Sequence, residues 1–240
     1  MKTVRVIGAN GFVGSAFVRH LSKEPGIEVR PVSRENRLEE LGQHSAIVID
    51  CTGNPRKYLA EEDPVQDFQL SVAERVHTLH HFPADLCLFV SSIDHKDGSN
   101  YDVHKRVMET LLQHFASDWL IVRLSGMVGP GLKKNAVYDI IHDLPIRVRP
   151  DSFYQYMLTD DAARISWELL SSGMRKEIIN VVGDGLITLP EVAAIAGREL
   201  DLSLVRSDWE PWTQETDISR LKSLMPVPRT RDTIEAFVHA

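Results

Sequence analysis

Residues 2–14 read KTVRVIGANGFVG, and this stretch decides the fold that we expect. Its first half is a β-branched apolar run typical of a buried strand, and residues 12–21 have helical periodicity. Gly8, Gly11 and Gly14, spaced three apart, therefore lie at a junction of strand and helix. Such a junction offers backbone N–H groups and a favourable dipole to a nucleotide pyrophosphate, and glycine leaves no Cβ in the way. The stretch predicts a dinucleotide-binding turn, although glycines also end many strands only to make a turn.

Each glycine of this turn has an expected task. Gly8 would allow the tight turn, Gly11 the close approach of the ligand, and Gly14 the close packing of helix on strand. The candidate cofactor-binding residues of the turn are Gly8, Asn10, Gly11, Phe12, Val13 and Gly14.

Further along the chain, short apolar runs continue to alternate with longer helical stretches. Strands are expected in TVRVIGA, IEVRPVSR, AIVIDCTG, LCLFVSS and WLIVRLSG, with helices near residues 12–21, 38–41, 65–81 and 101–115. This order is typical of βαβ units with a parallel sheet. We expect an α/β fold with a Rossmann-type doubly wound parallel sheet in residues 1–130. A small C-terminal substrate lobe in residues 131–240 would be interleaved with the same body.

The smaller lobe has a looser pattern. A helix is expected over residues 136–142, one or two short strands and a helix in IRVRPDSFYQYMLTDDAARISWELL, and a strand in IINVVGDG. TLPEVAAIAGREL predicts a helix that Thr188 caps, and DTIEAFVHA predicts a closing helix. Arg147 and Arg149 would share one face of a strand.

Composition excludes several classes of protein. The 240 residues are 43% hydrophobic and 25% charged, as in average soluble globular proteins, and the net charge of −7 gives no footprint for a nucleic acid or an anionic membrane. No apolar stretch approaches the roughly 20 residues that cross a bilayer, and no signal-peptide pattern opens the chain. Cys51 and Cys87 stand in expected buried strands, which suits a reducing compartment. We expect a cytoplasmic protein with no nucleic-acid or membrane partner.

The end of the second expected strand reads EVRPVSREN and bears on the choice of dinucleotide. An acidic residue there accepts a hydrogen bond from the ribose 2′-OH, whereas a basic residue accommodates a 2′-phosphate. Ser33 and Arg34 stand in this place, and arginine can bind phosphate bidentately. The alternative is a solvated surface arginine. The pattern predicts NADP(H) as the preferred cofactor, with NAD(H) as the second choice.

Tyr101 and Lys105 lie four apart on an expected helix, so their side chains share one face. Hydride transfer to a carbonyl needs a proton donor, and a phenol with an ordinary pKa of about 10 donates poorly near neutrality. A nearby ammonium stabilises the phenolate. Ser92, at the end of LCLFVSS, would lie at the carboxyl edge of the sheet and hydrogen-bond the reacting oxygen. The catalytic candidates are Ser92, Tyr101 and Lys105.

With these motifs in place, the chain resembles the extended short-chain dehydrogenase/reductase family, in its NAD-dependent epimerase/dehydratase branch. The resemblance follows GANGFVG, Cys51-Thr52-Gly53, VSS, YDVHK, RLSGMVGPG, YMLTDDAA, INVVGDGLITLPEVA and DISRLKSL in order. The family implies a small lobe that usually holds a nucleotide-diphosphate sugar. It also implies cofactor contacts from Ser33, Arg34, Cys51, Thr52, Gly53, Ser91, Tyr101, Lys105 and Leu124. A homodimer through the Tyr101 helix is a further family expectation.

The chain also departs from the family pattern. Only eight residues, IDHKDGSN, separate Ser92 from Tyr101. This short form resembles the reductase portion of capsular-polysaccharide enzymes that make deoxy-amino sugars, which share the SRENRLEEL-like and GLKKNAVYDII-like stretches. Dehydratases of the family carry Thr-Asp-Glu where this chain has Ser92-Ile93-Asp94, so the middle acid of the pattern is missing. Its absence disfavours a dehydration reaction. Gly126 and Ser71 replace two asparagines that are common in the family.

We therefore expect an NADP(H)-dependent oxidoreductase that acts on a sugar carbonyl or alcohol, most simply a nucleotide-sugar 4-keto reductase. The alternatives are an epimerase with tightly held NAD and a non-catalytic NADP(H)-sensing regulatory protein, which intact Tyr101 and Lys105 disfavour. The candidate substrate-binding residues are Ser92, Asp94, Lys134, Asn135 and Arg147. His77, His80 and His81 lack convergent cysteines or carboxylates, so no metal site is expected.

Overall fold

The computed structural model describes residues 1–54, 57–93, 98–206, 208, 210–213 and 215–240, which divide into two compact units. The first unit comprises Met1–Arg123 and Ala163–Ile179, and the second comprises Leu124–Ala162 and Asn180–Ala240. The chain thus passes between the units three times. The expected division into residues 1–130 and 131–240 stays a prediction.

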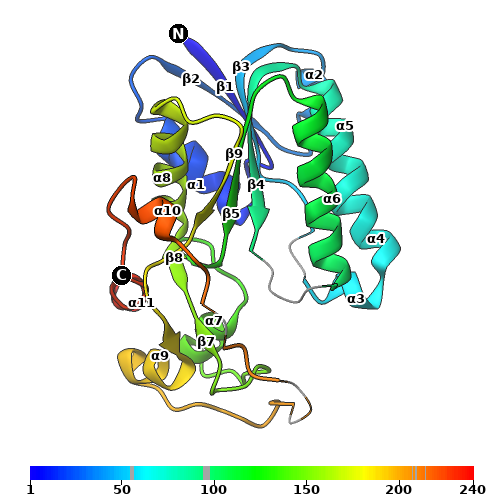
Figure 1. Ribbon diagram of the computed structural model, residues 1–240. Coiled ribbons are helices and arrows are strands. Elements are labelled where there is room, and N and C mark those ends of the chain that lie inside the picture. The colour runs from blue at the N-terminus through cyan, green and yellow to red at the C-terminus, as the bar shows by residue number, and fades with distance from the viewer. Residues whose placement is uncertain (55–56, 94–97, 207, 209, 214) are drawn as a thin grey trace. The chain divides into compact units, whose positions relative to one another are not determined.

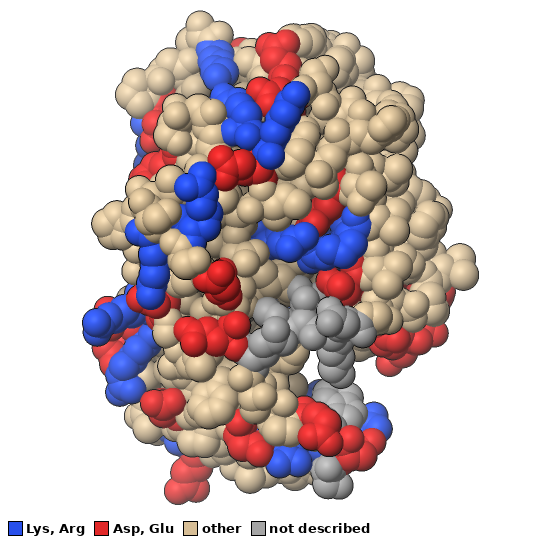
Figure 2. All heavy atoms as spheres, viewed as in Figure 1, with Lys and Arg blue, Asp and Glu red and all other residues tan. Residues whose placement is uncertain are grey.

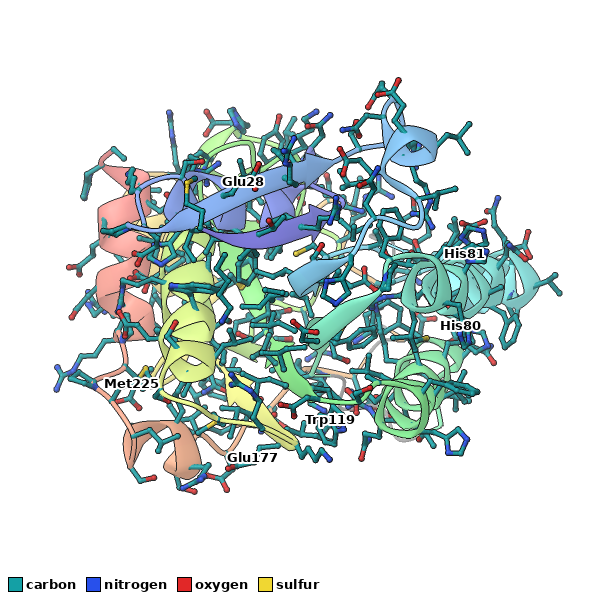
Figure 3. The ribbon with its side chains drawn as sticks, turned by 90° about the horizontal axis from the view of Figure 1, so that it is seen from above. Glu28, His80, His81, Trp119, Glu177 and Met225 are labelled. Carbon is teal, nitrogen blue, oxygen red and sulfur yellow. The ribbon has the colours of Figure 1, made fainter. Side chains whose placement is uncertain are left out.

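A six-stranded parallel sheet forms the first unit, in the order β2-β1-β3-β4-β5-β9 (Figure 1). Its strands are β1 (Lys2–Ile7), β2 (Ile27–Val32), β3 (Ser45–Asp50), β4 (Ala84–Ser92), β5 (Trp119–Leu124) and β9 (Glu177–Val181). The five strands expected in the first 130 residues are confirmed. The strand expected in IINVVGDG also forms, but it extends this sheet as β9 and does not belong to a separate small-lobe sheet. Figure 3 shows Trp119 and Glu177 side by side where β5 and β9 begin, and the backbone N–H of Lys176 donates to the carbonyl of Trp119 at 2.6 Å.

Helices cover both faces of this sheet, so the unit is doubly wound. Figure 1 shows α1 and α8 on one face and α5 and α6 on the other. The helical segments are α1 (Phe12–Leu21), α2 (Arg37–Glu40), α3 (Leu59–Glu62), α4 (Pro64–Phe68), the π-helical η1 (Gln69–Ala73), α5 (Glu74–His81), α6 (Asn100–Phe115) and α8 (Thr159–Ser171). The helix expected over residues 65–81 is therefore interrupted by a π-helical turn. Such turns are frequent at functional sites.

One core cluster of the first unit lies between the sheet and helices α5 and α6. Its buried members are Ile7, Val32, Val48, Phe82, Cys87, Phe89, Met108, Leu112, Trp119 and Ile121. Because the strands are covered on both faces, they are continuous apolar runs, as expected for parallel sheets. His80 and His81, by contrast, are exposed near the end of α5 (Figure 3).

The second unit has its own core and two small sheets. Its elements are β6 (Gly126–Val128), α7 (Ala136–Ile141), β7 (Phe153–Tyr154), β8 (Tyr156–Leu158), β10 (Ile187–Thr188), α9 (Leu189–Ala196), α10 (Ser219–Lys222) and α11 (Thr230–Val238). β6 pairs with β8 in parallel, and β7 pairs with β10 antiparallel. The predicted N-cap at Thr188 is confirmed as a full capping box with Glu191.

The strand expected around Arg147 and Arg149 is wrong. Ile146 is buried and Val148 packs against the core of the second unit, which produces the alternating pattern. The N–H of Ile146, however, donates to the carbonyl of Asp201 at 2.9 Å, and no strand is assigned to residues 146–149. The alternation therefore reflects burial in a loop.

Charged side chains of both signs are scattered in small groups over the face shown in Figure 2, most of which consists of other residues. Acidic side chains gather over α3, which carries Glu61 and Glu62. Among the described residues, no helix combines the length and the apolar character that crossing a bilayer requires.

Candidate active site

The strand order of the first unit reverses between β1 and β3, since β2 lies beyond β1 and β4 lies beyond β3. Ligands of doubly wound sheets bind at the carboxyl ends of the strands beside such a switch point. The glycine turn follows β1, and the segment Cys51–Gly53 follows β3, so both lie there. A Cβ on Gly8 would be 3.2 Å from the Cγ2 of Thr52 and 3.3 Å from the carbonyl carbon of Cys51.

The backbone of the glycine turn leaves no room for side chains. Gly8 has φ +79°, a conformation that L residues rarely adopt. A Cβ on Gly14 would lie 2.1 Å from the carbonyl oxygen of Gly8, and one on Gly11 would lie 3.0 Å from the same atom. Gly11 is the N-cap of α1 and has no side chain to cap it. The first amides of α1 are thus left for a ligand, and the predicted turn has the geometry to hold a pyrophosphate.

The other residues of the turn differ in exposure. Asn10 is exposed, and Phe12 and Val13 are half-buried at the start of α1. Their roles as cofactor contacts stay predictions.

The turn after β2 is held by its own side chains. The hydroxyl of Ser33 donates to the carboxylate of Glu35, while the N–H of Ser33 donates to Oδ1 of Asn36 at 2.8 Å. Arg34 is exposed beside this turn. The hydrogen bond from Ser33 lowers the pKa of Glu35, and Arg34 adds to this effect. The sequence prediction did not include Glu35 in this turn. The available signal was an acidic residue directly after Arg34.

Tyr101 and Lys105 come together on the first turns of α6. The Nζ of Lys105 lies 5.1 Å from the centre of the Tyr101 ring, which is half-buried. The helix begins where the side chain of Ser99 accepts a hydrogen bond from the N–H of Asp102 at 3.1 Å. Lys57, which the sequence prediction missed, places a second ammonium 5.8 Å from the same ring centre. The expected phenol and ammonium pair is thus present.

Lys105 is buried, with 5% of its surface exposed. Burial, and after it the positive charge of the nearby Arg75, lower the pKa of its amine to about 7, while Asp50 and Asp67 act in the opposite direction. A lysine with such a pKa exchanges protons near neutrality, which suits an acid–base site.

Ser92 ends β4, and its hydroxyl donates to the carbonyl of Ile93 at 3.0 Å. The guanidinium of Arg106 on α6 donates to the carbonyl of Ser92, so the strand end is tied to the helix that carries Tyr101 and Lys105. Asp94 lies outside the described residues.

The remaining predicted cofactor residues lie at the same strand ends, but several of their side chains point inward. Thr52 donates from its hydroxyl to Asp50 at 2.5 Å. Ser91 donates to the buried Glu109 at 2.6 Å, and Leu124 is buried at the end of β5. Burial raises the pKa of the Cys51 thiol, and Asp50 adds to this rise, so Cys51 is not a reactive thiolate. Both cysteines are free.

A buried polar network beside α6 was also missed. Asp67, fully buried on α4, accepts hydrogen bonds from Asn54 at 2.6 Å and from Ser71 at 3.2 Å. His104 contacts the same carboxylate through Nδ1 at 2.6 Å. Ser71 lies in the π-helical turn, so this turn has a structural task in the network. The contacts of Asp67 with Asn54 and with His104 join residues 13 and 37 apart in the sequence, a separation that local patterns do not report.

The candidate substrate residues of the second unit lie on loops. Lys134 and Arg147 are exposed. Burial raises the pKa of Asp139, and the positive charge of Arg147 offsets part of this rise. Asn135 caps α7 by accepting from the N–H of Tyr138 at 2.9 Å and donates to the carbonyl of Met127 at 3.0 Å. Their substrate roles stay predictions. At Gly126, a Cβ would lie 2.7 Å from the ring of Tyr156, which explains why no asparagine stands there.

Comparison with known proteins adds to this geometry. No family model matches the chain. A curated relative, a UDP-2-acetamido-2,6-beta-L-arabino-hexul-4-ose reductase of Pseudomonas aeruginosa, is 32% identical over 163 residues, which are 62% of this chain and 44% of the relative. The chain therefore spans less than half the length of the curated relative that it matches.

Solved structures match over nearly the whole chain. RMD from Pseudomonas aeruginosa, complexed with NADPH, has a TM-score of 0.81 at 17% identity and covers 100% of this chain and 98% of its own. A Thermus thermophilus UDP-glucose 4-epimerase in complex with NAD has a TM-score of 0.79 at 17% identity, covering 99% and 98%. These matches confirm the Rossmann-type fold. Together with the curated relative, they confirm the resemblance to extended short-chain dehydrogenases and reductases.

Proposed function

We propose that this chain is an NADP(H)-dependent oxidoreductase that reduces the 4-keto group of a nucleotide sugar. The observation that carries the proposal is the Tyr101 and Lys105 pair at the switch point of the sheet, where the Nζ of Lys105 lies 3.2 Å from the position of a Cβ on Gly53. The curated relative is a reductase of a UDP-linked hexul-4-ose, and a solved neighbour is complexed with NADPH, which supports the substrate class and the cofactor.

The residues present fit a dinucleotide. Gly14 and Gly11 let the start of α1 lie close against the carbonyl oxygen of Gly8, the first turn of α1 supplies amides without a side-chain cap, and Arg34 is exposed after the end of β2. When bound, NADPH would supply the hydride. The remaining chemistry belongs to the chain itself.

The carbonyl carbon of the sugar would be reduced by the hydride that the bound dinucleotide supplies, and the dinucleotide would leave in its oxidised form. The phenol of Tyr101 gives its proton to the carbonyl oxygen, and solvent returns a proton to the phenolate. Ser92 hydrogen-bonds the reacting oxygen, and Lys105 stabilises the negative charge on Tyr101 as the proton leaves.

We place the enzyme in the cytoplasm, since its two free cysteines suit a reducing compartment, and we retain a homodimer through α6 as part of the proposal. Neighbours that are 4-epimerases with NAD make an epimerase the second candidate.

Calorimetric titration of the purified protein with NADPH and with NADH tests the proposal, together with reduction of a 4-keto UDP-sugar followed at the NADPH absorbance. We expect an initially empty site, tighter binding of NADPH and stoichiometric oxidation. Tightly retained NAD with no net NADPH consumption would support the epimerase instead.

A further inference from the structure

Asp67 is a fully buried carboxylate on α4 of the first unit. Its Oδ1 accepts hydrogen bonds from the side-chain amide of Asn54 at 2.6 Å and from the hydroxyl of Ser71 at 3.2 Å. The same hydroxyl accepts a hydrogen bond from the N–H of Asn54 at 3.4 Å. The Oδ2 of Asp67 lies 2.6 Å from Nδ1 of His104 on α6. One buried carboxylate therefore joins α4 to η1, to α6 and to the segment that follows β3.

The segment after β3 is held on both sides of Gly53. Before the glycine, the carboxylate of Asp50 accepts hydrogen bonds from the N–H of Thr52 at 2.9 Å and from its hydroxyl at 2.5 Å. After the glycine, Asp67 holds the side-chain amide of Asn54. Gly53 itself has φ +118° and no side chain that could fix its backbone. The position of Gly53 therefore depends on the bonds of its two neighbours.

This segment borders both features that we expect to bind the dinucleotide. A Cβ on Gly53 would lie 3.2 Å from Nζ of Lys105, so the backbone of the glycine packs directly against that amine. One residue earlier, the Cγ2 of Thr52 would lie 3.2 Å from a Cβ on Gly8 in the glycine turn. A shift of the segment would change the space beside the turn and beside the lysine together.

Asp67 also reaches the catalytic helix. His104 is half-buried on α6, three residues after Tyr101 and directly before Lys105. Because its ring bonds the same carboxylate that holds Asn54, the helix and the segment after β3 share one anchor.

Stability alone does not account for a carboxylate in this place. Removing the charge from water costs several kcal/mol, and well-packed apolar residues often replace buried ion pairs without loss. A buried polar network whose members all have partners does, however, fix one arrangement of the segments that it joins.

We propose that Asp67 is a positioning residue, which holds the Gly53 segment against α6 so that the glycine turn and Lys105 bind one dinucleotide together. Asp67 acts through Asn54 and, being fully buried, does not touch the cofactor itself. The benefit to reduction rests on the proposed function, whereas the effect on dinucleotide binding is measured without any reaction.

The test compares two changes at Asn54. Asn54→Leu keeps the size of the side chain and removes the donor to Asp67. The double variant Asn54→Asp with Asp67→Asn keeps a donor and an acceptor in exchanged positions. By calorimetry, the affinity for NADPH should fall at least about tenfold in Asn54→Leu, the scale of a hydrogen bond to a charged group. It should stay within about threefold of the unaltered protein in the double variant.

Hydrogen exchange of the cofactor-free protein gives an independent readout. The amides of residues 51–54 should exchange faster in Asn54→Leu and at the original rate in the double variant. If Asn54→Leu does not fold, Ser71→Ala decides, because it removes the bond to the N–H of Asn54 and should show the same two effects with smaller size.

Arg5→Gln is the matched control. Arg5 is also buried in the sheet and bonded to Glu40 at 2.9 Å, so its loss should lower the free energy of unfolding and leave NADPH affinity unchanged. A smaller loss of affinity than expected in Asn54→Leu, an equal loss in the double variant, or the same loss in Arg5→Gln overturns the proposal.

Steady-state kinetics separate this proposal from the proposed function. In Asn54→Leu, the KM for NADPH should rise at least about tenfold while the KM for a 4-keto UDP-sugar changes less than threefold, since a general loosening of the fold would raise both. If the binding pattern is as expected but no ketone is reduced, the proposed function fails and the positioning role stands. If ketone is reduced but the double variant does not recover NADPH affinity, the positioning role fails and the proposed function stands.

Discussion

The carboxyl edge of the sheet in the first unit and the loops of the second unit both carry candidate ligand-binding residues, but they are built differently. At the sheet edge, Gly14 cannot carry a Cβ and Lys105 is 5% exposed. In the second unit, Lys134 and Arg147 are exposed on loops. Packing fixes the residue types at the sheet edge, whereas the candidate residues of the second unit extend into solvent.

This difference shows which functional residues can be recognised from the sequence. A residue type that backbone geometry or burial requires leaves a pattern, such as three glycines at fixed spacing or a tyrosine and a lysine on one helix face. An exposed lysine leaves the same pattern whether or not it binds a ligand. The proposed chemistry accordingly lies in the first unit, and substrate recognition in the second unit is its least constrained part.

The largest effect that we expect is on Tyr101. Tyr101→Phe removes the proton donor, so turnover should fall about 10²–10⁴-fold, while NADPH affinity stays within a few-fold. Steady-state kinetics and calorimetry measure the two quantities. Unchanged turnover would contradict the assignment of the proton to Tyr101.

Gly14→Ala should be the most damaging change to the cofactor turn. Its Cβ would stand 2.1 Å from the carbonyl oxygen of Gly8, so α1 has to move, at a cost of about 3 kcal/mol in the free energy of unfolding. Chemical denaturation measures this cost, and NADPH affinity should fall at least tenfold. Gly11→Ala, where the corresponding distance is 3.0 Å, should be milder. Equal effects would mean that crowding against Gly8 does not shape the turn.

The burial of Lys105 predicts a pH dependence of stability. Its pKa of about 7 in the folded protein lies below the ordinary value of 10.5, so the unfolded chain binds more protons between these values. Stability of the cofactor-free protein should therefore gain a few kcal/mol from this group as pH rises through that window, and lose it as pH falls. Denaturation at pH 7 and pH 9.5 should show a smaller rise in Lys105→Met. The same rise in both proteins would place Lys105 in water.

Arg34 tests the cofactor preference. Arg34→Ala should weaken NADPH binding by roughly 1.5–3 kcal/mol, the scale of a hydrogen bond to a charged group, and spare NADH. Arg30→Ala, on the same strand and paired with Glu28, is the control that should leave both affinities unchanged. Equal losses for the two dinucleotides in Arg34→Ala would refute the contact with the 2′-phosphate.

The smallest effect belongs to the second unit. Arg147→Ala should raise the KM for a nucleotide sugar only a few-fold, because an exposed charge contributes less than about 1 kcal/mol. Arg149→Ala serves as the control, since Arg149 already holds Asp151 at 2.8 Å. A hundredfold rise for Arg147 would make this loop as decisive as the sheet edge and would remove the contrast between the two regions.

The sequence predicted the features of the first unit that depend on neighbours along the chain. Strand β1, the glycine turn and α1 follow from one continuous stretch, and Tyr101 and Lys105 follow from helical spacing. Arg75 and Asp50 lie 25 residues apart, and their contact arises only when α5 packs on the sheet. Local patterns carry no information on such a contact.

The alternation around Arg147 indicated a strand, but no partner strand is assigned along it in the described chain, and the packing of Ile146 and Val148 against the core of the second unit produces the pattern. The sequence did predict the strand β9. It did not predict that β9 pairs with β5, because β5 has an unpaired side for another strand only once the other strands have assembled into the sheet.

The most direct test of the central claim uses NADPH that carries deuterium on the transferred position of the nicotinamide, together with a 4-keto UDP-sugar. Mass spectrometry of the product and the yield of NADP⁺ are measured. We predict one deuterium in each product molecule, one NADP⁺ released for each, and loss of both in Tyr101→Phe. Conversion of the sugar without deuterium and without NADP⁺ release would contradict the account.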